Sequence, residues 1–238
     1  MSNGFFQFKQ FTVWHDRCAM KVGTDGVLLG AWASAEQVRR VLDVGCGSGL
    51  IGLMLAQRYP QAEVVGIEID PEAADQAAEN MAHSPWTERM QVVKGDFCDY
   101  HPAETFDLIV SNPPYFVDAL RSPVGERSLA RHAAGLNYES LFRKSHELLA
   151  EGGRVCVILP AEAVALAVDA ASRNQLFPDH KMCVYTKQGK PLRRVMLSFG
   201  TSIEPCQTTD LYLMNADGSY SAGYRWLTAD FYLRLLEV

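Results

Sequence analysis

The chain has 238 residues, which suits one large domain, and its 48% hydrophobic and 21% charged residues are typical of a globular protein rather than a disordered one. The formal net charge of −6 argues against nonspecific coating of nucleic acid, although a local basic patch would still bind phosphates. The six cysteines are scattered without a C-x-x-C pair, which argues against a zinc site and a disulfide framework. No apolar run approaches the roughly 18 residues of a membrane span, and residues 1–11 carry no signal-peptide core, so we expect a cytoplasmic protein.

The middle of the chain alternates short apolar runs with longer helical stretches, which is the rhythm of parallel β/α units. The predicted strands are 41–44, 63–67, 90–93, 106–111 and 154–159, and the predicted helices are 50–58, 71–81, 137–149 and 161–174. Gly152 and Gly153 are expected to end the helix 137–149 as a left-handed cap. Two late β-rich segments, 181–186 and 195–199, predict an antiparallel hairpin at the sheet edge. We therefore expect an α/β fold with a core at 41–200, an N-terminal extension (1–40) over the site and a C-terminal extension (201–238).

A glycine-rich turn follows the first predicted strand. Gly45, Gly47 and Gly49 allow positive φ and let a ligand approach the backbone. In an open parallel sheet, ligands bind at the carboxyl ends of the strands. The alternatives are a tight β–α turn without a ligand and a dinucleotide site, but Leu50 stands where the dinucleotide fingerprint requires a third glycine.

Acidic residues accompany the first three predicted strands. Glu68 ends the second strand, where a carboxylate can accept hydrogen bonds from two ribose hydroxyls. Asp70 competes for that role, but its place before Pro71 suits a helix cap. Asp96 follows the third strand, where it can accept a hydrogen bond from an adenine amino group. Together with Asp43, these acceptors indicate a nucleoside-containing cofactor.

The segment Asn112-Pro113-Pro114-Tyr115 directly follows the fourth predicted strand. An aryl amino nitrogen is a weak nucleophile because its lone pair is delocalised into the ring. The Asn112 side-chain oxygen and the Pro113 carbonyl are suited to accept the two amino hydrogens and turn that lone pair toward an electrophilic methyl group. Consecutive prolines fix the backbone and bring no competing N–H groups, and Tyr115 can stack on a flat substrate. In isolation the same residues would also suit a rigid double-proline turn.

In these motifs the chain resembles the class I methyltransferases that act on amino groups, and the resemblance runs from about Gly23 to Phe199. The segments 19–32 and 226–233 further resemble the bacterial tRNA1(Val) (adenine-37-N6)-methyltransferases. The resemblance implies a single Rossmann-like domain with a seven-stranded sheet in the order 3-2-1-4-5-7-6. It implies S-adenosylmethionine as cofactor and tRNA as partner, without a metal, a membrane or an obligatory protein partner. The implied cofactor residues are Thr24, Asp25, Asp43, Gly45, Gly47, Gly49, Glu68, Asp96, Phe97 and Asn112.

A protein that binds the anticodon loop of tRNA needs cations near the site, where phosphate contacts give affinity and the pocket selects the base. An unpaired adenine in that loop can be flipped out at little cost. Basic side chains follow Tyr115 and recur in the late hairpin turn, where Lys187 and Lys190 precede two arginines. The residues expected to contact RNA are Arg121, Arg127, Arg131, His132, Arg193 and Arg194.

Three other functions fit parts of this pattern. A glutamine N5-methyltransferase acting on release factors also methylates a planar nitrogen, but such enzymes usually carry a separate helical N-terminal domain. A guanine-N2 methyltransferase of rRNA usually has a duplicated domain, which 238 residues do not allow. A non-catalytic RNA-binding module would have no use for the paired acceptors at Asn112 and Pro113.

Overall fold

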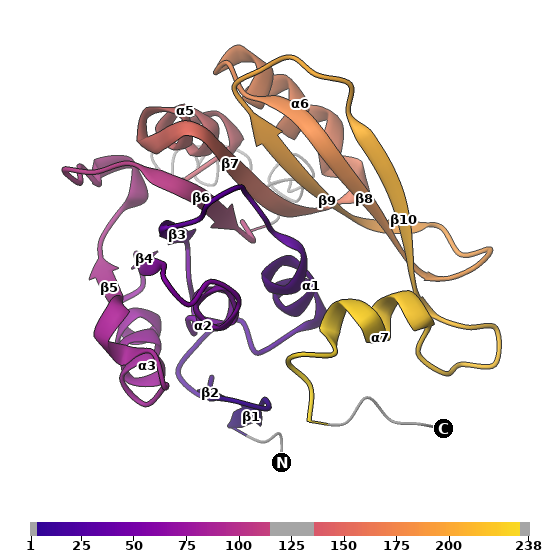
Figure 1. Ribbon diagram of the computed structural model, residues 1–238, viewed down its shortest axis with the longest axis horizontal. Coiled ribbons are helices and arrows are strands. Elements are labelled where there is room, and N and C mark those ends of the chain that lie inside the picture. The colour runs from indigo at the N-terminus through magenta and orange to yellow at the C-terminus, as the bar shows by residue number, and fades with distance from the viewer. Residues whose placement is uncertain (1–3, 115–135, 234–238) are drawn as a thin grey trace, which may run out of the picture.

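The computed structural model describes residues 4–114 and 136–233. Its main sheet has eight strands in the order β10-β8-β9-β7-β6-β3-β4-β5 (Figure 1). These strands are β3 (Arg40–Val44), β4 (Glu63–Glu68), β5 (Met90–Lys94), β6 (Phe106–Ser111), β7 (Leu149–Pro160), β8 (Phe177–Lys187), β9 (Leu192–Gly200) and β10 (Gln207–Met214). All neighbouring pairs are parallel except the two that β9 makes with β7 and β8.

The strands from β3 to β9 lie in the predicted order, but the predicted count of seven was wrong. An eighth strand, β10, comes from the expected C-terminal extension and pairs in parallel with β8. The first half of β10 is polar and exposed, and Leu211 is its buried residue. The alternation of apolar and polar residues that identifies a half-buried strand is therefore weak here.

Helices cover both faces of the sheet (Figure 1). One face packs against α5 (Tyr138–Leu148) and α6 (Val164–Arg173) through a cluster that includes Phe142, Val157 and Phe199. The other face is covered by α1 (Thr24–Trp32), α2 (Leu50–Arg58), α3 (Pro71–Ala82) and α7 (Ala222–Thr228). The short 3-10 helices are η1 (Thr87–Arg89), η2 (Phe97–Asp99) and η4 (Ala161–Ala163).

Helix ends follow local chemistry. The Asp70 side chain accepts hydrogen bonds from the Glu72 and Ala73 amides, so Asp70 caps α3 as its place before Pro71 predicted. At α5, Asn137 and Ser140 form a reciprocal capping box. These caps satisfy amides that would otherwise lack partners at the helix starts.

The predicted glycine cap after α5 was wrong. The helix ends at Leu148, and Gly152 and Gly153 lie within β7, where Leu149 pairs with Phe106 and Arg154 pairs with Leu108. Several residues of β7 therefore bulge out of the ladder, with Gly152 at φ +74°. A Cβ on Gly153 would lie 3.0 Å from the Asp107 carbonyl oxygen, so the bulge needs glycine for space as well as for conformation.

Residues near the two ends of the described chain, including Phe8, Phe11 and Phe231, pack together against α2 and α3. The hairpin β1 (Phe5–Gln7) and β2 (Thr12–Trp14) joins the C-terminal segment through a bridge between Phe8 and Tyr232. The rings of these two residues stack with centroids 5.9 Å apart. In the described part of the chain, no helix combines the length and the apolar character needed to cross a membrane.

Candidate functional site

The glycine turn lies at the carboxyl edge of the sheet, between β3 and α2. Gly45, Gly47 and Gly49 all have positive φ, of 67°, 53° and 77°. No described atom lies within 4 Å of a Cβ built on Gly45 or Gly47, so these two positions need glycine for backbone conformation. The Gly45 and Cys46 amides both donate to the Ile67 carbonyl, at 2.9 and 3.1 Å, which ties the turn to β4.

Glu68 ends β4 beside this turn, and its side chain is 9% exposed. One carboxylate oxygen accepts a hydrogen bond from the Gly47 amide at 2.8 Å, and the other accepts from the Asp70 amide at 3.0 Å. A carboxylate offers about four acceptor positions, so each oxygen can accept one further donor. The geometry leaves Glu68 able to receive a pair of hydroxyl groups without giving up its backbone bonds.

Ile69 was missed by the sequence reasoning. It follows Glu68 directly, and its apolar side chain is 65% exposed at the carboxyl edge. An exposed β-branched side chain beside an anchored carboxylate can pack on the flat face of a ring. An apolar residue that directly follows a buried strand gives no sign in sequence that it faces solvent.

Asp43 lies beneath the turn and is fully buried. Its Oδ2 accepts from the Gly52 amide at 2.9 Å, while Oδ1 has no hydrogen-bond partner among the described residues. Burial raises the pKa of this carboxyl from 3.8 to about 7, the Gly52 bond opposes that rise, and the Glu68 charge adds to it. The carboxyl therefore connects β3 to the first turn of α2 from below.

The raised pKa of Asp43 predicts a pH-dependent stability. The folded chain binds the proton more tightly than the unfolded chain, so the contribution of Asp43 to the free energy of unfolding falls as pH rises from about 4 to about 7. Within that window this contribution to the free energy of unfolding falls by up to about 1.4 kcal/mol per pH unit. Asp43→Asn removes the titration. Urea unfolding should therefore show that the free energy of unfolding of the variant rises relative to that of the wild type between pH 5 and pH 7. The exposed-site variant Asp75→Asn is the control, and a pH-independent difference for Asp43→Asn would refute the prediction.

Asp96 and Phe97 follow β5, on the other side of β4 from β3. Asp96 is half-buried and caps η2, because its Oδ1 accepts from the Cys98 amide at 2.8 Å. Phe97 was expected among the cofactor residues, but its ring is buried in the cluster beneath α5. The ring is therefore not exposed at the carboxyl edge of the sheet.

Asn112 follows β6 at the same edge of the sheet. The preceding residue, Ser111, pairs with Val44 in the ladder and donates its hydroxyl to the Val44 carbonyl at 2.9 Å. This fixes the end of β6 against the start of the glycine turn. The Asn112 Oδ1 is buried and has no hydrogen-bond partner among the residues that the structure describes. A buried acceptor without a donor is costly, so it indicates a group that binds there.

Pro113 is buried, Pro114 is exposed, and neither residue has an N–H to compete for the Asn112 oxygen. Tyr115, predicted to stack on the substrate, lies outside the described residues. The predicted RNA contacts Arg121, Arg127, Arg131 and His132 also lie outside them.

Thr24 and Asp25 begin α1, and Thr24 is exposed. The Arg194 guanidinium donates through Nε to Asp25 Oδ2 at 2.7 Å. Arg194 stands in register with Pro160 at the carboxyl end of β7, so this ion pair joins α1 to the same edge of the sheet. Asp25, which was predicted to bind the cofactor, is thus in direct contact with Arg194, which was predicted to bind RNA. The neighbouring Arg193 is exposed.

The N-terminal segment reaches the Glu68 side of the site. Cys18 is largely buried, and burial raises the pKa of its thiol to about 11, with the nearby carboxylates of Glu68 and Asp70 adding to the rise. Burial raises the pKa of Cys46 in the glycine turn as well. Within the described residues, no group of three or more His, Cys, Asp or Glu side chains could hold a metal ion.

Comparisons with known proteins agree with this geometry. Residues 20–168 match the family model described as methyltransferase small domain. The chain is 49% identical to the tRNA1(Val) (adenine(37)-N6)-methyltransferase of Bacteroides thetaiotaomicron, over 99% of this chain and 100% of that protein. It is 46% identical to the protein of the same name from Aeromonas hydrophila, over 98% of this chain and 99% of that protein. Among solved structures, a predicted O-methyltransferase from Agrobacterium tumefaciens has the same fold, with a TM-score of 0.67 at 20% identity over 87% of this chain and 96% of that one.

Proposed function

The chain belongs to the methyltransferase small-domain family and, within it, to the tRNA1(Val) (adenine(37)-N6)-methyltransferases, and on that premise we propose that it transfers a methyl group from S-adenosylmethionine to the N6 amino group of adenine 37 in tRNA1(Val). The observation that carries the proposal is the buried Asn112 Oδ1, for which the described residues supply no donor at the end of β6 beside the glycine turn. An amino group would supply a donor to this oxygen.

The residues at the carboxyl edge fit the proposed cofactor. Glu68 keeps an acceptor position on each oxygen for the two ribose hydroxyls, and exposed Ile69 offers an apolar surface for the adenine ring. The open space above Gly45 and Gly47 allows a ligand to approach the turn. We assign Asp43 to holding this turn from below, through Gly52, rather than to direct contact with the cofactor. Thr24, Asp25 and the half-buried Asp96 remain proposed cofactor residues.

S-adenosylmethionine, when bound, supplies a methyl group on a positively charged sulfur. The chain's own residues act on the other reactant. Asn112 Oδ1 and the Pro113 carbonyl accept the two hydrogens of the amino group, which rotates the nitrogen lone pair out of the ring plane. Because these acceptors are fixed by β6 and by proline, they need no reorganisation when the nitrogen begins to carry positive charge. The nitrogen then loses a proton to solvent, and a strong general base is not required.

The proposed RNA contacts surround the same edge. The hairpin between β8 and β9 has its tip at the carboxyl edge, since Pro160 pairs with Arg194 there. Arg193 is exposed on this hairpin, together with Lys190 in its turn. We propose that these cations bind phosphates, while Arg194 acts mainly through Asp25 to fix the hairpin to α1. A tRNA substrate also implies a cytoplasmic location.

The test is incubation of the purified protein with methyl-labelled S-adenosylmethionine and one of three acceptors. These are a tRNA1(Val) transcript, the same transcript with guanine at position 37, and a release factor. N6-methyladenosine in the first transcript alone, identified by nucleoside mass spectrometry, is the expected result. Label in the release factor would instead support glutamine methylation, and label in none of the three would support a binding module.

A further inference from the structure

Asn80 lies in the last turn of α3 and is 1% exposed, yet its side chain connects three separate parts of the chain. Its Oδ1 accepts from the Trp14 amide at 2.9 Å. Its Nδ2 donates both to the Trp14 carbonyl, at 2.8 Å, and to the Ser48 carbonyl, at 2.8 Å. Both donor hydrogens and the acceptor oxygen are therefore used to join the end of β2 and the glycine turn to α3.

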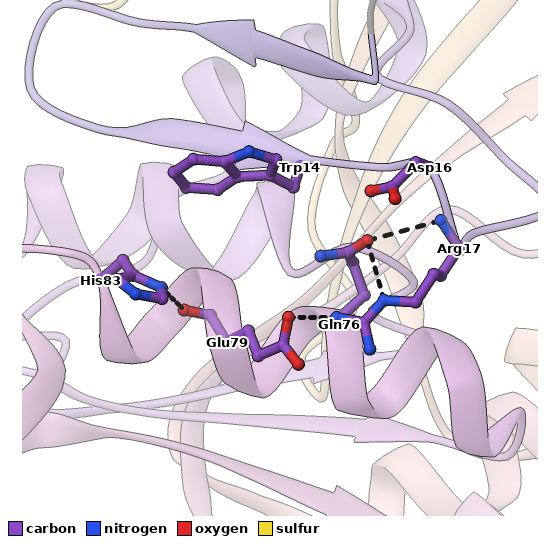
Figure 2. A pocket seen from close by; sticks show the side chains of 6 residues that line it. All are labelled: Trp14, Asp16, Arg17, Gln76, Glu79 and His83. Atoms are coloured by element: carbon purple, nitrogen blue, oxygen red, sulfur yellow. Dashed lines mark hydrogen bonds and ion pairs between the residues drawn. The ribbon is translucent and has the colours of Figure 1, made fainter.

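A second attachment lies one turn earlier on α3. The Arg17 amide and its Nε both donate to Gln76 Oε1, each at 3.4 Å, and Arg17 forms an ion pair with Glu79. Figure 2 shows Trp14 lying over α3 and Arg17 reaching across to Gln76. Between them lies a shallow pocket of about 240 Å³, in which the rings of Trp14 and His83 are 5.8 Å apart. Arg17, Gln76 and Glu79 line this pocket and bond to one another, so the pocket marks where residues 14–17 attach to α3.

The attached chain forms one wall of the proposed cofactor site. Residues 16–22 continue from β2 to the start of α1, and Cys18 within them is largely buried close to Glu68 and Asp70. Glu68 in turn accepts from Gly47, one residue before Ser48 in the glycine turn. The N-terminal wall, the ribose acceptor and the turn are therefore held together, with Asn80 bonded to two of the three.

We propose that Asn80 is a positioning residue that couples the N-terminal segment 12–23 to the glycine turn, so that closure of this segment and cofactor affinity depend on each other. The proposal rests on the proposed function only in taking S-adenosylmethionine as the ligand of the turn. Because such coupling is reciprocal, bound cofactor must stabilise the segment as much as the segment favours the cofactor. Asn80 itself touches neither cofactor nor substrate.

Asn80→Ala tests the coupling. The variant leaves the Ser48 carbonyl and both Trp14 backbone groups without partners, so we expect the dissociation constant for S-adenosylhomocysteine, measured by calorimetry, to rise about tenfold. We also expect hydrogen exchange of residues 12–23 to become faster and to lose the slowing that the ligand produces in the wild type. The rate at saturating S-adenosylmethionine should stay within about twofold, because Asn112 and Pro113 are unchanged.

Ser84→Ala is the matched control, since Ser84 is also buried, just after α3, and its hydrogen bonds within the described chain are to Met81, Met90 and Trp86 and not to β2 or the turn. It should leave ligand affinity and exchange of residues 12–23 as in the wild type. Arg17→Ala is a second test that does not depend on Asn80→Ala folding. It changes an exposed side chain, so it loosens the same segment without disturbing the core and should raise the dissociation constant for S-adenosylhomocysteine about threefold. Unchanged affinity in Arg17→Ala with faster exchange of residues 12–23 would overturn the coupling. A wild type that does not bind the ligand would instead count against the proposed function.

Discussion

Replacing Asn112 with alanine is expected to reduce methyl transfer at least about 100-fold while changing the affinity for S-adenosylmethionine by less than about threefold. The reason is that the Asn112 Oδ1 is buried and without a partner among the described residues, so its hydrogen bond forms only when the amino group is present. Removing one preorganised polar group of this kind costs about 100- to 1000-fold in kcat in other enzymes. Single-turnover rates on tRNA, with calorimetric binding of the cofactor measured separately, distinguish the two effects.

Asn174→Ala is a suitable control for this prediction. Asn174 follows α6, where it hydrogen-bonds Glu139 and the Ala170 carbonyl, on the face of the sheet opposite α2. Its loss should lower stability modestly and leave turnover unchanged. If Asn112→Ala lowered the affinity for S-adenosylmethionine by more than tenfold and kept normal turnover at saturation, Asn112 would belong to the cofactor site and not to the amino-group site.

Replacing Glu68 with alanine is expected to have the opposite pattern, raising the dissociation constant for S-adenosylmethionine about 100-fold. Two hydroxyl groups would lose a charged acceptor, and a hydrogen bond to a charged group contributes about 1.5–3 kcal/mol. The Gly47 and Asp70 amides would also lose their acceptor, so the glycine turn would become less ordered. Equilibrium binding of cofactor in the absence of RNA measures this effect directly.

The affinity of the Glu68 variant for tRNA should stay within about twofold of the wild type, because the proposed phosphate contacts lie on the β8–β9 hairpin. Glu72→Gln provides the control, since Glu72 is an exposed carboxylate in the first turn of α3, four residues away in sequence. Cofactor affinity in Glu68→Ala equal to that of Glu72→Gln would remove Glu68 from the ribose role.

The sequence predicted best where the signal is local. Pro71 after Asp70 identified the start of α3, and the glycines at 45, 47 and 49 identified a turn whose backbone has the expected positive φ. Glu68 and Asn112 could be predicted as neighbours because both end parallel strands, and such ends meet at one edge of a sheet. By contrast, Gly152 and Gly153 failed as a predicted cap because glycine serves a bulge and a helix end equally well, and the register with β6 decides between them.

What the sequence determined by itself was the order of the elements between residues 41 and 200 and the chemistry at the strand ends, since apolar periodicity and turn residues act over a few positions along the chain. Tertiary structure alone decided which side chains became bridges between distant segments. Asn80 is an ordinary helical residue in sequence, and only packing brings it to Trp14 and Ser48, which are 66 and 32 positions away. Arg194 likewise meets Asp25 across 169 positions. Long-range hydrogen bonds of this kind leave no periodic pattern in the sequence. They form only when folding brings separate elements together, and the local pattern of one element does not indicate which other element it will contact.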